Sequence, residues 1–199
     1  RWEDPQAELE SLDLSDGLPM VPPTLDRFDA MISGRGAPDQ SFGHLMPLMG
    51  ELTLEAVAYN CILAGCRPEE LPVVLTAAEA CTDDGFNLLG VLSTTGTPTV
   101  AICVHGSLVT DLDMNAGSNA LGPGNRANAC IGRAVSLIMR NVAGAKPGVA
   151  DMATMGQPGK YTFCFAESAH PGFPSLPERR GFGANESCVT RSCSPLLPQ

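Results

Sequence analysis

The stretch NRANACIGRAVSLIMRNV, residues 125–142, decides the fold class of the core. Apolar side chains recur in it at spacings of three and four residues, which is the period of an α-helix with one buried face. The residues of this face are Ala127, Cys130, Ile131, Ala134, Leu137, Ile138 and Val142. We predict a long amphipathic helix that begins at Asn125 or Arg126 and ends before Gly144.

Two further helices are predicted upstream of this one. The first covers residues 53–64, with Thr53 as its N-cap and Gly65 as its C-terminal stop. The second covers residues 68–81, and its regular part begins only at Leu71, because a proline follows that residue. The two helices form a hairpin around the glycine.

Between and after these helices the pattern changes to short apolar, β-branched runs. Such runs are typical of buried strands joined by loops. The predicted strands cover residues 87–92, 99–104, 108–112 and 161–165. Together with the helices they predict an α/β fold with a small central sheet.

Both ends of the chain are rich in proline or glycine and predict extended arms. Residues 1–50 are expected to be irregular apart from one short helix, 25–32, capped by Thr24. Residues 145–199 are expected to be irregular apart from the strand named above. With no internal repeat or linker, the chain is predicted to be one domain with a core at 51–144.

Composition limits the class of protein. The net charge of −10 disfavours a nucleic-acid partner, which needs a basic face to displace counterions. No apolar run reaches the roughly 18 residues that cross a bilayer, and residues 1–5 lack the layout of a signal peptide. We therefore expect a cytoplasmic protein with no membrane partner, and mostly reduced thiols among its eight cysteines.

The loop NAGSNALGPGNRAN, residues 115–128, precedes the long helix and predicts a binding site. The N-terminus of a helix carries partial positive charge and free N–H groups, which attract carboxylate or phosphate. Arg126 adds a guanidinium that suits bidentate recognition of a carboxylate. The other candidates for substrate binding are Asn115, Asn119, Asn125 and Asn128. The alternative is an ordinary loop with an asparagine N-cap and no ligand.

Four residues are candidates for catalysis. His105 follows the predicted strand 99–104, and Lys160 and Glu167 flank the strand 161–165, where each side chain could move a proton. Cys164 lies within that strand as a nucleophile, or alternatively as a buried core thiol. The three histidines are far apart and no ligand spacing is present, so no metal site is predicted and no cofactor is identified.

Cys188 and Cys193 are redox candidates. They lie in a polar segment beside Arg191, and a neighbouring cation can lower the pKa of a thiol. Their spacing suits a small disulfide or a resolving pair. The alternative is a chance pair in a disordered terminus.

Four phrases resemble a family of uncharacterised bacterial proteins associated with UGSC-type (seleno)proteins, which are named for a Sec/Cys-Gly-Ser-Cys motif. The phrases are DGLPMVPPT (16–24), NCILAGCRPEELPVVLTA (60–77), NALGPGNRANACIGRA (119–134) and GQPGKYTFCFAE (156–167). The UGSC motif itself is absent. The resemblance implies a bacterial metabolic protein that is one part of a larger thiol-dependent enzyme, and it implies no substrate.

Two functions remain open from the sequence. The first is an enzyme, thiol-dependent and of oxidoreductase or lyase type, that acts on a small anionic metabolite held at the 115–128 loop. The second is a non-catalytic subunit or binding module of a larger complex, whose Pro-rich arms contact a partner or a second copy.

Overall fold

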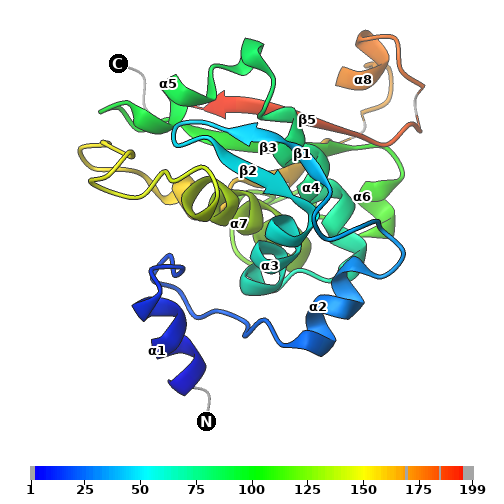
Figure 1. Cartoon of the computed structure of the whole chain (residues 1–199). Coiled ribbons are helices and arrows are strands. Elements are labelled where there is room, and N and C mark those ends of the chain that lie inside the picture. Colours follow the sequence, from blue (N-terminus) through cyan, green and yellow to red (C-terminus); the bar gives the residue numbers. More distant parts are fainter. Residues whose placement is uncertain (1–2, 169, 184, 195–199) are drawn as a thin grey trace.

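The computed structural model describes residues 3–168, 170–183 and 185–194, and its centre is helix α7 (Figure 1). This helix, Arg126–Asn141, has Asn125 as its N-cap, whose side chain accepts a hydrogen bond from the Asn128 amide. One face of α7 contacts helices α3 and α4, and it also touches strands β3 and β4. The long helix predicted from the apolar period is confirmed.

The other elements fall into helices and two small sheets. The helices are α1 (Glu3–Ser11), α2 (Leu25–Ile32), α3 (Leu54–Ala64), α4 (Leu71–Ala80), α5 (Leu88–Ser93), α6 (Leu108–Asp111) and α8 (Leu176–Arg179). The strands are β1 (Ser41–Leu45), β2 (Gly50–Thr53), β3 (Thr99–His105), β4 (Cys164–Ala166) and β5 (Cys188–Ser194). The chain therefore has a mixed α/β fold, as predicted.

Helices α3 and α4 follow the predicted caps. The Thr53 hydroxyl accepts a hydrogen bond from the Ala56 amide, and Gly65, in the left-handed region at φ +86°, closes the C-terminus. A 3₁₀ turn at Pro68–Glu70 leads into α4, which begins at Leu71. Both helices and the hairpin between them are confirmed.

The functional candidates are positioned by a three-stranded sheet of order β4-β3-β5. Strand β4 runs parallel to β3, with Cys103 beside Phe165. Strand β5 runs antiparallel to β3, with Cys103 opposite Thr190. Ile102 and Val104 are fully buried in the core. By alternation Cys103 and His105 share the other face of the sheet with Thr190.

Two predicted strands are helices. Residues 87–92 lie mostly in α5, because the Asn87 side chain caps the first turn by accepting a hydrogen bond from the Gly90 amide. Residues 108–112 lie mostly in α6, which follows a sharp turn at Gly106 with φ +79°. The strand predicted at 161–165 is shorter and begins later in the chain, at Cys164–Ala166, because a 3₁₀ turn precedes it.

The arms are more ordered than predicted. Residues 1–50 contain α1, α2 and the first strand of the β1–β2 hairpin, because the prolines stand in the first turn of α1 or between elements. Only α2 was predicted there, and Thr24 precedes it without a side-chain cap. The segment 188–194, expected to be irregular, is strand β5. No helix in the described parts of the chain is long and apolar enough to cross a membrane.

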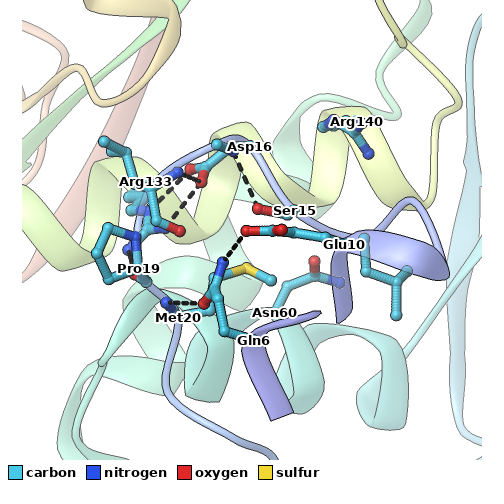
Figure 2. Close-up of polar contacts among 12 residues, drawn as sticks. Gln6, Glu10, Ser15, Asp16, Pro19, Met20, Asn60, Arg133 and Arg140 are labelled. Atoms are coloured by element: carbon cyan, nitrogen blue, oxygen red, sulfur yellow. Dashed lines mark hydrogen bonds and ion pairs between the residues drawn. The ribbon is translucent and has the colours of Figure 1, made fainter. Parts of the chain in front are cut away.

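Residues 12–24, which we call the N-terminal strap, join α1 to α2 along one side of α7. Figure 2 shows Arg133 reaching from α7 to the strap, where its guanidinium contacts both carboxylate oxygens of Asp16 at 2.8 Å. The Gln6 side chain of α1 accepts a hydrogen bond from the Met20 amide at 2.9 Å. Polar contacts therefore fix both α1 and the strap.

Candidate functional site

The asparagines of the 115–128 loop bind the loop itself. The Asn128 amide, on a residue that is 4% exposed, accepts from the Asn115 N–H at 3.1 Å and donates to two loop carbonyls. Asn125 donates to the Asp113 carbonyl at 2.7 Å, and Asn119 donates to the Pro123 carbonyl at 2.9 Å. These contacts fit the alternative interpretation of the loop, in which asparagines cap and shape it without a ligand.

Arg126 has an anionic partner inside the protein. Its guanidinium forms a bidentate ion pair with Glu70, with 3.1 Å between Nη1 and Oε2. The Glu70 side chain is 1% exposed and that of Arg126 is 37% exposed. Hydrogen bonds to Glu70 raise the pKa of Arg126. We expected Arg126 to bind the carboxylate of a substrate, but it is paired with a buried carboxylate of the protein itself.

Glu70 was not among the predicted site residues, although a local signal was present. Its carboxylate accepts a hydrogen bond from the Arg67 amide at 2.8 Å, three residues earlier. A glutamate at the third position of a helical turn is typical of such a cap. The contact with Arg126 joins residues 56 positions apart, and no local pattern indicates it.

Two predicted catalytic residues meet on the sheet face that Ile102 and Val104 do not share. His105 Nδ1 lies 2.6 Å from Glu167 Oε2, and His105 Nε2 lies 2.9 Å from Thr190 Oγ1. The His105 residue is 2% exposed, while the side chain of Glu167 is 28% exposed. The second Glu167 oxygen accepts from the Leu176 amide at 2.9 Å. A carboxylate, an imidazole and a hydroxyl therefore form one hydrogen-bonded chain.

The carboxylate partner favours one arrangement of protons along this chain of contacts. A carboxylate at Nδ1 favours the neutral tautomer with its proton on that nitrogen, which leaves Nε2 as the acceptor for a hydroxyl proton. In this tautomer Thr190 donates to His105, and His105 donates to Glu167. A hydroxyl, a base and a group that orients the base is the arrangement that activates a nucleophile. Thr190 was not among the predicted site residues, and its only local signal is the alternation of an apolar with a polar residue at Val189 and Thr190.

Two thiols share this face of the sheet: Cys103 lies across from Thr190, and Cys188 lies across from His105. Burial, and then the negative charge of Glu167, raises the pKa of Cys103 to about 12. A thiol with such a pKa stays protonated at neutral pH and is a poor nucleophile. The geometry at His105 therefore favours the hydroxyl over the thiol.

The other two catalytic candidates lie apart from His105. Lys160 pairs with Asp151, at 2.8 Å and 2.7 Å from the two carboxylate oxygens. Cys164 is 4% exposed in the core, and burial is the main cause that raises its pKa. Cys164 thus has the environment of a core thiol.

The redox candidates Cys188 and Cys193 lie five residues apart on one strand. An odd separation places them on opposite faces of the sheet, and five residues span about 16 Å, far beyond the roughly 7 Å that a disulfide allows between Cα atoms. Burial, with Glu186 as a second cause for Cys188, raises the pKa of both thiols. Arg191 is engaged elsewhere, over the Phe86 ring and near Asp83.

A cluster of other thiols lies at the C-terminus of α3. A hydrogen bond with Cys61, followed by burial, raises the pKa of Cys66 well above its usual range. Cys130 of α7 is also nearby, and burial raises its pKa. All eight cysteines lie in the described ranges and are unpaired. Within those ranges, no group of three His, Cys, Asp or Glu side chains could hold a metal ion.

Comparisons with known proteins add nothing to this geometry: no family model, no curated protein and no solved structure matches the chain. The resemblance to UGSC-associated proteins stays a prediction from the four sequence phrases.

Proposed function

We propose that the protein is an enzyme of acyl transfer or hydrolysis that acts on a small ester, thioester or amide, with Thr190 as its nucleophile. The observation that carries this proposal is the hydrogen-bonded series Thr190–His105–Glu167. Its residues come from β5, from β3 and from the position directly after β4, and they lie up to 85 residues apart in the sequence. The proposal uses a hydroxyl nucleophile in place of the thiol nucleophile expected from the sequence, because every cysteine with a resolved pKa shift is shifted upward.

The reaction follows from the polarity of the contacts. Thr190 Oγ1 attacks the acyl carbon while its proton passes to His105 Nε2. The Glu167 carboxylate stabilises the imidazolium that forms, and His105 then gives the proton to the leaving group. Water, deprotonated by the same nitrogen, releases the acid and restores the hydroxyl. Proton transfer of this kind contributes roughly 10²–10⁴ in rate.

A structural role for the same residues is the competing explanation. His105 on the central strand contacts residues at both neighbouring strands, so the series also ties the sheet together. The non-catalytic subunit predicted as the second function would need only this role. The two explanations differ in what the Thr190 hydroxyl does after the protein has folded.

The test uses a fluorophosphonate probe and p-nitrophenyl acetate. We expect a covalent adduct on Thr190, found by peptide mass spectrometry, and ester hydrolysis that Thr190→Val abolishes. Thr190→Ser keeps a hydroxyl and should keep labelling, and Glu167→Gln should slow hydrolysis about 10²-fold or more. Ser192→Ala, two residues along β5, is the matched control and should change neither.

Stability must be measured on the same variants. If Thr190→Val lowers the free energy of unfolding but the wild type shows no adduct and no hydrolysis above the Val variant, the series is a tie between strands and the proposal is wrong.

A further inference from the structure

A cavity of about 600 Å³ lies at the opposite end of β3 from His105. Its walls come from α7, from the first residues of β3 and from the loop 145–161. Val100 lines it, and Val100 precedes His105 by five strand residues, or about 16 Å. The cavity is therefore a place distinct from the Thr190–His105–Glu167 series.

Most of the cavity wall is apolar. The apolar side chains that line it include Leu92, Pro98, Val100, Leu137, Met139 and Met155. Small-molecule sites in proteins have volumes of roughly 300–1,000 Å³, apolar walls and a few polar groups that fix orientation. This cavity has the size and the wall of such a site.

Two cations among the polar groups of the wall have N–H donors to spare. Lys160 faces Asp151, which offers two oxygens, while an ammonium has three N–H donors. Arg140 also lines the cavity. Its Nη1 makes two hydrogen bonds and its Nη2 makes one, so N–H donors on Nε and Nη2 have no partner among the described residues. Ser136, on the same face of α7, lines the cavity and makes no side-chain hydrogen bond to any described residue.

The ionised side chains that line the cavity are two cations, Arg140 and Lys160, and two carboxylates, Asp16 and Asp151. Asp16 is paired with Arg133, and Asp151 is paired with Lys160. Arg140 shares its partner Asp13 with Lys146, so one carboxylate serves two cations there. This incomplete neutralisation beside Arg140 favours a bound anion.

We propose that this cavity binds an amphipathic organic carboxylate, with its hydrocarbon or aromatic part against the apolar wall and its carboxylate at Lys160 and Arg140. Ser136 donates its hydroxyl to the same carboxylate. A phosphate without an apolar part would leave the wall unfilled and binds more weakly.

The probe is 4-phenylbutyrate, and the matched ligands are its primary amide and inorganic phosphate. Calorimetric titration should show binding of the carboxylate roughly tenfold tighter than of the amide, the difference that a hydrogen bond to a charged group supplies. Equal affinity for the acid and the amide would overturn the assignment of the charge. No binding of either would overturn the cavity as a site.

Two charge variants should change the affinity in opposite directions, so their effects can be told apart from a general loss of the folded structure. Lys160→Gln should weaken binding of 4-phenylbutyrate. Asp151→Asn frees the ammonium from its competing carboxylate and should strengthen binding several-fold. A gain of affinity is not a result that partial unfolding gives. If both variants weaken binding equally, the pair only supports the loop and the proposal is wrong.

Two substitutions of different size at Ser136 test whether the ligand lies in the cavity. Ser136→Phe fills the cavity without breaking any side-chain hydrogen bond and should abolish binding, while Ser136→Ala leaves the space open and should cost only a few-fold. Thr190→Val should leave the affinity unchanged, so that failure of this proposal and failure of the enzymatic one are seen separately.

Discussion

Arg126, the first residue of α7, is paired through both guanidinium ends with the carboxylate of Glu70, and only 1% of the Glu70 side chain is exposed. Removing one partner of a buried pair leaves an uncompensated charge, which costs about 3–5 kcal/mol when both are fully buried. Because Arg126 is partly exposed, we expect Arg126→Met to lower the free energy of unfolding by roughly 2–3 kcal/mol.

Urea denaturation of single and double variants measures this. The double variant Arg126→Met/Glu70→Met should recover most of the loss, because neither charge is then left alone. Arg179→Met, an exposed arginine on α8, is the control and should change stability by less than about 0.5 kcal/mol. If Arg126→Met is no less stable than the control, water rather than Arg126 stabilises the negative charge of Glu70.

Gly132 of α7 lies against the residues that lead into β4. A Cβ atom there would lie 2.5 Å from Thr162 Oγ1 and 2.7 Å from the Phe163 backbone nitrogen. In an exposed helix the change from glycine to alanine stabilises by up to about 1 kcal/mol. Here we expect the opposite sign, a loss of about 1–3 kcal/mol from overpacking.

The control for Gly132→Ala lies on the same helix. Ser136→Ala removes a hydroxyl without a described partner and should stabilise by a few tenths of a kcal/mol. Thermal unfolding of both variants checks the difference in sign. A stabilised Gly132→Ala would mean that α7 can move away from β4 at no cost.

The helices were predictable because their signals are local. Thr53 and Gly65 bracket α3, and the apolar period of α7 runs for more than four turns. The helix at residues 87–92 was not predicted, because six residues are too few to distinguish the period of a strand from that of a helix. Strand β5 is formed by pairing with β3 across some 85 residues, and composition alone does not indicate such pairing.

The candidate site was predictable in part for the same reason. His105 and Glu167 were each named from their position at the end of a strand, but their contact depends on the parallel pairing of β3 with β4. Thr190 and Glu70 were missed because their partners are 85 and 56 residues away. The anion expected for Arg126 was sought outside the chain, whereas the fold supplies it from within.

Buried thiols predict a loss of stability at alkaline pH. Burial raises the pKa of Cys81 to about 12, from 9.0 for a free thiol. Between these values the unfolded chain has lost the proton and the folded chain keeps it, so the unfolded state binds fewer protons and stability falls as pH rises. One such thiol contributes a slope of up to about 1.4 kcal/mol per pH unit.

Urea unfolding from pH 8 to pH 11 measures this slope. Cys81→Ala should give a shallower fall than the wild type, because one shifted group is absent. Cys193→Ala, at an exposed position, is the comparison and should change the slope less. Alkylation at neutral pH gives a second measurement, in which Cys81 and Cys164 react only on unfolding. Fast labelling of either thiol would contradict its buried environment.

Protonation of Asp13 and Asp16 at acid pH should weaken the attachment of the N-terminal strap. Hydrogen bonds from Lys146 and then Arg140 lower the pKa of Asp13 to about 2. Burial disfavours the Asp16 carboxylate, but hydrogen bonds from Arg133 and the Leu18 amide outweigh it, so the pKa of Asp16 is also lowered. Carboxylates with lowered pKa stabilise the fold above their unfolded pKa, and this contribution is lost as pH falls through the folded value.

The strap and α1 should therefore loosen between about pH 4 and pH 2, before the core does. Amide hydrogen exchange should increase in residues 3–20 while α3 and α7 remain protected. Asp16→Asn imitates the protonated carboxyl and should raise exchange in the strap already at pH 7, whereas Asp39→Asn, an exposed control, should not. If Asp16→Asn leaves the strap protected and acid opens the whole molecule at once, apolar contacts such as that of buried Leu9 hold α1, and the arginine pairs do not.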